Sequence, residues 1–515
     1  MADVNGADEN GTVVGAEQIS GIDKKRLNIT IMGDGFVAAE LPGFKADAAG
    51  LVDYLTTLKP FDSDFVQSGL AFHRIDVAST DSGAADPVAC GGTGAAPKTY
   101  FNSTFCGDGV IRRLVTADDT RVVAVSDDKV PETHNRVLLV NSAIYGGSGG
   151  SAVAVVSRSG DWHGVVAHEL GHSAFGLADE YQYYSGCGSG EVGHDTYAGG
   201  EPAEANVTAN TDRKTLKWRR LVAESTKLPT MINNDPATCL LAADPNAANP
   251  VVGAYDGARY FHAGLYRGAY SCMMRNAGQP FCAVCQRKIL QTLTPFMEVD
   301  YAMQQGAAKN ALVGVGSRGT VICYNGRATF DDPTRGAGME GRVYLRTADS
   351  IFSSISFVAE ITATVTAPPD LPPQGIVFFG MGEGLPRSDY SDEPKDGSHV
   401  FCRVFPEAFF DAAFVVTSNL VENPVAGVGS AGGVGTHRLQ LKWNAETLTA
   451  QFLLHAHYQG GPFVPTATLA PVDCSANGFN AFNARLFFGG GGGTMYSDFT
   501  VRGARDGEGL DPTFT

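Results

Sequence analysis

Apolar positions in the first 295 residues follow two alternating patterns. Short apolar runs rich in β-branched residues predict strands at 27–32, 72–77, 137–140 and 152–156. Apolar residues at helical spacing predict helices at 44–58, which stops before Pro60, at 162–175, where Asp161 can cap the start, and at 286–293. Strands that alternate with helices indicate an α/β domain.

The pattern changes after about residue 305, where short alternating segments recur between turns rich in Pro and Gly. Such spacing predicts an all-β sandwich. The predicted strands lie at 341–345, 355–362, 376–380, 401–405, 438–443, 449–455, 484–488 and 498–501. We therefore expect an α/β (α+β) domain over 21–304 and a β-sandwich over 305–515. The polar residues 1–20 are expected to form a disordered leader.

Charge and composition exclude several classes of protein. Lys and Arg number 38 against 55 Asp and Glu, a net charge of −17, which argues against nucleic-acid binding and against a polybasic membrane surface. No apolar run reaches the roughly 18 residues that a membrane span needs. Only 18% of residues are charged and 63 are glycine, a composition common among extracellular, β-rich proteins.

The ten cysteines also favour an oxidising compartment, because many lie in loop sequence rich in Gly, Ser and Thr. We therefore expect a secreted protein, although the N-terminal segment shows no signal peptide. Proximity in sequence suggests the pairs Cys90–Cys106 and Cys187–Cys239. Cys282 and Cys285 form a CxxC without the second pair that a zinc ribbon needs, so we expect a disulfide or packed thiols there.

The strongest chemical signal is the HExxH motif at His168–His172, inside a predicted helix. Histidines at i and i+4 share one helix face, so both imidazoles can reach one zinc ion. A catalytic zinc keeps one tetrahedral position open for water, and Glu169 can take the proton from that water. The motif predicts a single catalytic zinc with His168 and His172 as ligands and Glu169 as the general base.

A third ligand is required, and the residues after the motif offer Asp179. Gly176 can reverse the chain at the helix end, and Asp179 follows three residues later. Metzincins have a similar pattern, HExxHxxGxxH, in which a glycine turn precedes the third ligand by three residues. Here the glycine comes one residue later. Glu180 is the nearest alternative, and the more distant Glu191, Glu201 and Glu204 are others.

Further residues could support a metal site of this kind. Metzincins place a methionine turn beneath the zinc, and the segment SCMMR at 271–275 offers one. The strand at 152–156 could be an edge that pairs with extended substrate, or an ordinary core strand. Candidate donors to a tetrahedral intermediate are Tyr181, Tyr266, Arg267 and Arg275.

The segment HELGHSAFGLADEY at 168–181 resembles the signature of the immunoglobulin-A peptidase family of zinc metallopeptidases. The resemblance includes MGDGF at 32–36, PF at 60–61, STDSG at 79–83, VNSAIYGGSGG at 140–150, CMMR at 272–275 and FCAVC at 281–285. It covers roughly residues 25–295. It implies a secreted zinc endopeptidase with a metzincin-like fold, with His168, His172 and Asp179 as ligands, Glu169 as base and Met274 in the methionine turn.

The C-terminal region resembles concanavalin-A-like jelly rolls in the segments 378–384 and 484–501. Such domains often bind carbohydrate through aromatic side chains and calcium. Candidate sugar-contacting residues are Trp443, His455, His457, Tyr458 and Tyr496, and Asp389, Asp392 and Glu393 could hold Ca²⁺, although core, edge or solvated positions would explain the same residues.

These features together predict a zinc endopeptidase that hydrolyses secreted or surface proteins and glycoproteins and carries an accessory carbohydrate- or surface-binding sandwich. One alternative is a carbohydrate- or surface-binding protein whose zinc domain is structural or degenerate. Another is a zinc hydrolase of non-peptide amides. The presence of both histidines, the glutamate and a third-ligand candidate argues against degeneracy.

Overall fold

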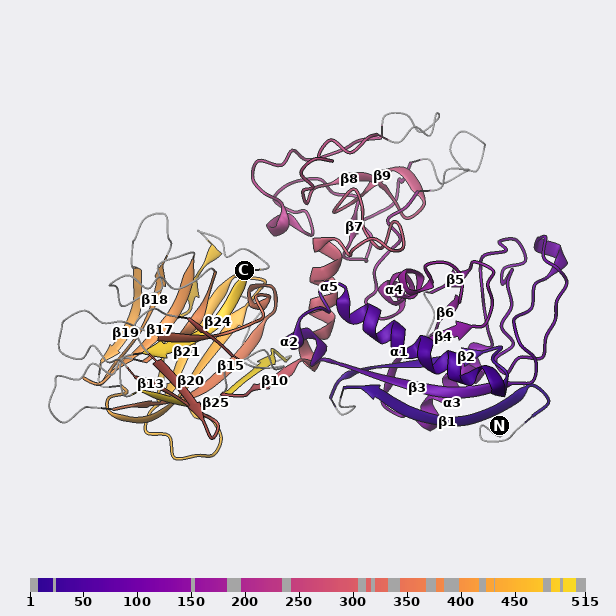
Figure 1. The fold of residues 1–515 in the computed structure, drawn as a ribbon. Coiled ribbons are helices and arrows are strands. Elements are labelled where there is room, and N and C mark those ends of the chain that lie inside the picture. Colours follow the sequence, from indigo (N-terminus) through magenta and orange to yellow (C-terminus); the bar gives the residue numbers. More distant parts are fainter. Residues whose placement is uncertain are drawn as a thin grey trace. The chain divides into compact units, whose positions relative to one another are not determined.

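The computed structural model describes residues 8–21, 25–149, 153–182, 196–233, 242–303, 312–315, 320–331, 343–366, 377–383, 398–415, 423–429, 431–475, 483–490 and 494–505. The chain folds into two compact units (Figure 1). The first comprises Met1–Asp62 and Gly69–Leu293, and the second comprises Ser63–Ser68 and Thr294–Thr515. No helix among the described residues is both long and apolar enough to cross a membrane.

The first unit is built on a mixed sheet with the strand order β1-β3-β2-β4-β6-β5. The inner strands β3, β2, β4 and β6 run parallel, whereas β1 and β5 are antiparallel to their neighbours. The strands span Gly11–Ser20 (β1), Leu27–Asp34 (β2), Leu70–Ser79 (β3), Thr133–Val140 (β4), Gly147–Ser148 (β5) and Val153–Ser157 (β6). Every residue of β2, β3 and β6 is buried, as expected for parallel strands covered on both faces.

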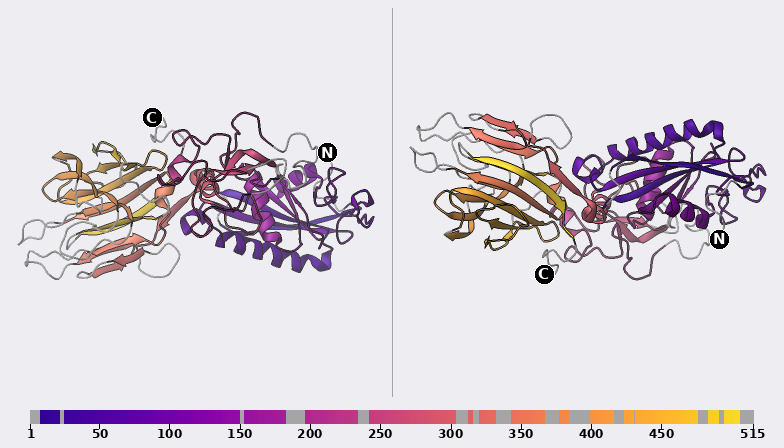
Figure 2. Two further views of the ribbon diagram at one scale, coloured as in Figure 1. Left: turned by 90° about the horizontal axis from the view of Figure 1, so that it is seen from above. Right: turned by 90° about the horizontal axis from the view of Figure 1, so that it is seen from below.

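Helices cover the two faces of this sheet. On one face Met32 and Ile75 pack with Val122 of α3 (Asp119–Lys129). On the other, Ile29 lies beside Leu55 of α1 (Leu41–Thr57) and Leu170 of α4 (Trp162–Ser173). Figure 2 shows α1, in indigo, running along the sheet in both views. Alternate side chains of each strand thus point to opposite faces of the sheet, and one of these faces packs against α4.

Strand β1 corrects the prediction of a disordered leader over residues 1–20 for its part from Gly11 to Ser20, whereas residues 1–7 lie outside the described residues. It pairs with β3 from Gly11 opposite Ser79 to Ser20 opposite Phe72. Most of its side chains are partly or fully exposed, so its sequence lacks apolar alternation. Backbone hydrogen bonds and the ion pair of Glu17 with Arg74 hold it at the sheet edge, and neither leaves a periodic signal.

The polar region after α4 contributes a second, small sheet with the order β7-β9-β8. These strands span Val207–Thr208 (β7), Tyr255–Ala258 (β8) and Phe261–Arg267 (β9), and α5 (Ala283–Leu293) closes the unit (Figure 1). The short 3₁₀ helices of this unit are Ala38–Glu40, Val88–Cys90 and Arg219–Leu221. The described residues between α4 and the end of the unit are therefore organised by this sheet and by α5.

The second unit is a β-sandwich of two antiparallel sheets, as its alternating pattern predicted. The first has the order β12-β13-β25-β15-β20-β21-β22, with β10 on β25 and β23 on β21, and the second the order β11-β14-β24-β16-β17-β18-β19. Phe488 of β24 packs on Tyr496 and Phe499 of β25, with ring centroids 4.9 and 5.3 Å apart, so the sheets meet face to face.

The strands of the first sheet span Glu298–Tyr301 (β10), Thr320–Tyr324 (β12), Arg327–Asp331 (β13), Phe357–Val365 (β15), Gly435–Asn444 (β20), Thr449–His455 (β21), Ala467–Thr468 (β22), Val472–Asp473 (β23) and Met495–Gly503 (β25). Those of the second span Leu312–Val315 (β11), Val343–Thr347 (β14), Val377–Glu383 (β16), His399–Phe405 (β17), Phe409–Val415 (β18), Asn423–Gly429 (β19) and Ala484–Gly490 (β24). The helices of this unit are α2 (Asp64–Gln67) and the 3₁₀ turns Thr294–Phe296 and Phe352–Ser354.

Two segments join the sandwich that the sequence placed with the first domain. Strand β10 pairs with β25, so the unit begins at Thr294 and not at residue 305. Helix α2 also belongs to this unit, because Phe65 packs on Phe352 at 5.1 Å and its N–H donates to Asp349. Both assignments depend on contacts between residues far apart in sequence.

Candidate metal centre

Helix α4 places the two histidines of the HExxH motif on one face. Asp161 caps its start by accepting from the N–H of Gly164, and Val166 and Leu170 on its apolar side are buried. His168 and His172 lie one turn apart on the other side and are partly exposed. Burial of the apolar stripe therefore turns the imidazoles away from the sheet.

The end of α4 brings the third predicted ligand back to the histidines. Gly176 adopts a left-handed conformation with φ of 61°, and the N–H groups of Gly176 and Leu177 donate to the last helical carbonyls. Asp179 Oδ1 then lies 3.0 Å from His168 Nε2 and 3.2 Å from His172 Nε2. The two Nε2 atoms are 3.2 Å apart, so the three atoms form a nearly equilateral triangle.

Backbone carbonyls hold both rings in the orientation that metal binding needs. His168 Nδ1 donates to the carbonyl of Met273 at 2.9 Å, and His172 Nδ1 donates to that of Leu177 at 2.7 Å. A carbonyl only accepts, so each Nδ1 carries the hydrogen in these bonds. The Nε2 atoms are left to face Asp179, and a backbone carbonyl on Nδ1 is the arrangement found around histidines that bind a metal through Nε2.

Asp179 is held on its other oxygen by Tyr260, whose hydroxyl donates to Oδ2 at 2.5 Å. Burial disfavours the charge of Asp179, but hydrogen bonds with His168 and His172 keep its pKa well below the ordinary value. Burial likewise opposes protonation of His172, yet the hydrogen bond and charge of Asp179 raise its pKa to about 9. The site thus attracts positive charge.

The donor set fits zinc. Two imidazole nitrogens and one carboxylate oxygen are ligands that Zn²⁺ accepts, and tetrahedral bonds of about 2.0–2.1 Å give ligand separations of about 3.3–3.4 Å. The observed separations of 3.0–3.2 Å are close to that value. His168, His172 and Asp179 are therefore the residues that would hold the ion.

Glu169 lies beside this triangle, against the glycine-rich segment around β5. A β-carbon on Gly149 would stand 2.4 Å from its Oε2, and one on Gly147 would stand 3.3 Å from its Oε1. Burial raises the pKa of Glu169, and the neighbouring His168 and His172 partly oppose the rise. The glycines leave the space that the carboxylate occupies.

Met274 packs beneath the motif, at the position predicted for the methionine turn. It is fully buried, and its sulfur would lie 2.4 Å from a β-carbon on Gly171 of α4. Its carbonyl accepts the N–H of Glu180 at 2.7 Å. The segment Met273–Met274 therefore contacts both helix α4 and the segment that carries Asp179.

Of the four candidate donors to a tetrahedral intermediate, one lies beside the site and three make contacts elsewhere. The Tyr181 ring lies nearly parallel to that of His168, with centroids 6.4 Å apart. Tyr266 lies on β9, where burial raises its pKa, and Arg275 donates to the carbonyl of Tyr270. Buried Arg267 donates to the carbonyls of Asp256 and Gly257. Of these, the structure brings Tyr181 to the triangle.

The alternative third ligands point elsewhere. Glu201 pairs with Lys217 at 3.0 Å, and Glu204 pairs with Arg259 at 3.6 Å. Glu180 turns toward Cys285 and Asn206, and Glu191 lies outside the described residues.

Two predictions about strands and cysteines are also answered. The strand predicted at 152–156 is internal, since β6 pairs with β4 and β5, so of the two alternatives the structure supports the core strand over the substrate-pairing edge. The Cys90–Cys106 disulfide is confirmed, whereas Cys187 and Cys239 lie outside the described residues. Cys282 and Cys285 are free thiols, so no disulfide joins them.

Sequence reasoning missed Tyr260, because it lies 81 residues from the aspartate that it contacts and belongs to no motif. In the sandwich, two of the candidate sugar-contacting residues are core residues: Trp443 and Tyr496 are fully buried. His455 lies at the surface near Tyr458 and Phe463, with ring centroids 5.2 and 6.0 Å away, and His457 is exposed. Asp389, Asp392 and Glu393 lie outside the described residues.

A family model described as IgA Peptidase M64 matches residues 17–239 and 231–293, which is more than half of the chain. No curated protein matches the chain.

Solved structures align with the chain at low identity. The lectin UEA-II complexed with galactose aligns with 40% of this chain and 98% of its own, at 11% identity and a TM-score of 0.30. Lectin II from Ulex europaeus aligns with 40% and 97%, at 12% identity and a TM-score of 0.29. The VIP36 exoplasmic/lumenal domain in its Ca²⁺/Man-bound form aligns with 42% and 92%, at 8% identity and a TM-score of 0.29.

Proposed function

The chain belongs to the IgA peptidase M64 family, and from that membership we propose that it is a secreted zinc endopeptidase with a metzincin-like catalytic unit that hydrolyses secreted or surface proteins and glycoproteins. The observation that carries the proposal is the convergence of His168, His172 and Asp179 beside Glu169. A degenerate domain would have no reason to keep three ligands and a base together.

Zinc held by these ligands would supply a Lewis acid that polarises the scissile carbonyl and acidifies water. The protein supplies the proton transfers. The Glu169 carboxylate accepts a proton from the attacking water and later donates it to the leaving nitrogen. Its burial raises its pKa toward the working pH, which suits a group that must both accept and release a proton.

The neighbouring side chains keep these groups in position. The carbonyls of Met273 and Leu177 orient the histidines, and Tyr260 orients Asp179. Tyr181 lies over His168, where its hydroxyl could donate to a developing oxyanion. We keep Tyr266 and Arg275 as weaker candidates for that role, since the contacts described for them lead elsewhere.

For the sandwich we propose an accessory role in binding carbohydrate or another surface. The supporting observation is the cluster of His455, Tyr458 and Phe463, three partly exposed rings of the kind that stack on sugars. Secretion is supported by the Cys90–Cys106 disulfide, which persists in oxidising compartments. Loss of glycan retention in a Tyr458→Ala chain with unchanged cleavage would place binding at this cluster.

The proposed activity is tested with the purified full chain and a denatured protein substrate, with and without a zinc chelator. We expect cleavage that the chelator abolishes and added Zn²⁺ restores. Glu169→Gln should keep its zinc but lose about 10²–10⁴-fold in rate, because it removes a general base and no ligand. Glu224→Gln, which changes an exposed glutamate of the same unit, is the matched control.

Two outcomes would contradict the proposal. Cleavage by Glu169→Gln at the wild-type rate would show that the base lies elsewhere. A wild-type chain that binds no zinc at the histidines and cleaves no protein would favour the alternative of a carbohydrate- or surface-binding protein with a degenerate peptidase domain.

A further inference from the structure

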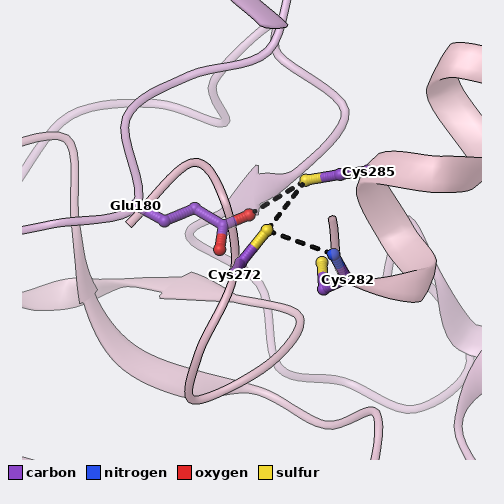
Figure 3. A group of neighbouring side chains, drawn as sticks. All are labelled: Glu180, Cys272, Cys282 and Cys285. Carbon is purple, nitrogen blue, oxygen red and sulfur yellow. Dashed lines mark hydrogen bonds between the residues drawn. The ribbon is translucent and has the colours of Figure 1, made fainter. Parts of the chain in front are cut away.

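A second group of metal-binding side chains lies apart from the histidines (Figure 3). It consists of Glu180, Cys272, Cys282 and Cys285, whose ligand atoms all lie within 4.8 Å of one another. Figure 3 shows the four side chains pointing toward a common centre. Glu180, Cys272 and Cys285 are buried, and Cys282 is partly buried. We call this group the thiol cluster.

The separations within the thiol cluster fit metal ligands and not a disulfide. Cys272 Sγ and Cys285 Sγ are 3.6 Å apart, whereas a disulfide bond measures about 2.05 Å. Tetrahedral Zn–S bonds of about 2.3 Å separate two sulfurs by about 3.8 Å. Cys285 Sγ also lies 3.2 Å from Glu180 Oε1, close to the separation of a sulfur and an oxygen that share one zinc ion.

Backbone N–H groups donate to two of the three sulfurs, those of Cys272 and Cys282. The N–H of Cys282 donates to Cys272 Sγ at 3.2 Å. At the start of α5 the N–H groups of Val284 and Cys285 face Cys282 Sγ. Donors of this kind favour the deprotonated sulfur, which is the form that binds metal.

Glu180 supplies an independent observation. Its Oε1 accepts from Asn206 at 3.0 Å, but its fully buried Oε2 has no hydrogen-bond partner among the described residues. A buried carboxylate oxygen without a partner is costly, and a cation removes that cost. The buried guanidinium of Arg267 lies close enough to interact with the charge of Glu180 and offsets part of the cluster's negative charge.

We propose that Cys272, Cys282, Cys285 and Glu180 form a second, structural zinc site. Three soft sulfur ligands and one oxygen in tetrahedral reach select Zn²⁺ over Ca²⁺ or Mg²⁺, which prefer oxygen. Four protein ligands leave no open position for substrate, so the site is structural and not catalytic.

The four ligands of this site come from three segments that border the histidine site. Glu180 follows Asp179 directly, Cys272 precedes Met273 and Met274, and Cys282 and Cys285 stand at the start of α5. One ion would tie these three segments together. The site therefore holds in place both the third ligand of the catalytic centre and the turn whose carbonyl orients His168.

The test uses the full chain and Co²⁺ as the probe. Thiolate ligands give a near-ultraviolet charge-transfer band with Co²⁺, whereas a site of two histidines and an aspartate has no sulfur and gives none. We expect His168→Ala/His172→Ala to keep about one equivalent of metal and the full thiolate band. Cys282→Ser should lose the band and about one equivalent of zinc. Cys402→Ser, which changes a buried free cysteine of the sandwich, is the matched control.

If Cys282→Ser does not fold, the wild-type chain answers the question through thiol labelling. Alkylation of Cys272, Cys282 and Cys285 should be slow with Zn²⁺ and fast after chelation, as mass spectrometry of the peptides would show. A disulfide between any two of these cysteines would overturn the proposal. So would a His168→Ala/His172→Ala chain that gives no thiolate band with Co²⁺. Either result would leave the proposed peptidase activity standing, because the ligands of its zinc are His168, His172 and Asp179.

Discussion

At the scale of single residues, the site depends on two adjacent acids that face different clusters. Asp179 lies 3.0 Å from His168 Nε2, whereas Glu180 lies 3.2 Å from Cys285 Sγ. Their carboxylates are chemically equivalent, so the motif alone left both as candidate ligands. The chain direction after Gly176 decides between them, because neighbouring side chains leave the backbone on different sides.

Asp179→Asn should weaken zinc binding at the histidine site by at least about tenfold, because it removes a charged ligand and the partner of both histidines. Competition with a metal chelator measures the change. Glu201→Gln, which alters a more distant candidate ligand, should leave the affinity unchanged, since Glu201 pairs with Lys217. Weaker zinc binding in Glu201→Gln together with unchanged binding in Asp179→Asn would show that Asp179 is not the third ligand.

At the scale of elements, the catalytic geometry depends on how α4 meets the segments around it. The carboxylate of Glu169 fits against Gly149, and Met274 fits against Gly171. In both places a glycine admits a functional side chain that any β-carbon would displace. The glycine-rich turn at 145–150 is therefore part of the site, although it contributes no ligand.

Gly149→Ala should reduce the cleavage rate while zinc stays bound. An added β-carbon would stand 2.4 Å from Glu169 Oε2, so the base must move. A shift of about 1 Å in a catalytic group can cost about 10²-fold in rate. Gly43→Ala on α1, where a β-carbon would meet nothing within 4 Å, should leave the rate unchanged. A wild-type kcat in Gly149→Ala would show that the base tolerates displacement.

In the segment between β3 and α3, the contribution of Asp86 to stability should depend on pH. Buried Asp86 accepts from Arg112 at 2.8 Å and from the N–H of Thr93 at 2.8 Å, and the Arg112 hydrogen bonds hold its pKa below the ordinary value. A lowered folded pKa adds stability that is present above the unfolded pKa of about 3.9 and is lost as pH falls further.

Asp86→Asn should therefore lose stability relative to wild type at pH 6 and differ less from it at pH 3. Urea unfolding of the first unit, followed at both pH values, measures the two differences. The exposed Asp53→Asn on α1 is the matched control. An equal loss at both pH values would mean that the charge of Asp86 does not contribute.

At the scale of the whole molecule, the division into units does not follow the order of the chain. The family model covers residues 17–293, yet the segment Ser63–Ser68 inside that range belongs to the sandwich unit. Phe61 contacts Phe175 of the first unit, whereas Phe65, four residues later, packs on Phe352. The chain therefore passes between the two units three times, at 62–63, 68–69 and 293–294.

Phe65→Ala should destabilise the sandwich unit by about 3–5 kcal/mol, because it empties a fully buried ring site. Phe61→Ala should instead destabilise the first unit. Calorimetry of the full chain, with limited proteolysis to show which unit opens, separates the two effects. Zinc content should stay unchanged in Phe65→Ala, and opening of the first unit in that variant would contradict the assignment.

The sequence by itself determined what depends on local spacing: α1 and α4, the alternating strands of the sandwich, the HExxH histidines and the turn at Gly176. It did not reveal β1, since an edge strand held by backbone hydrogen bonds needs no apolar pattern. The CxxC of Cys282 and Cys285 offers only two metal ligands in the sequence, because Glu180 and Cys272 come close to it only when the chain folds. Tertiary structure decided these points, because contacts between residues about 80 to 100 positions apart leave no periodicity to read.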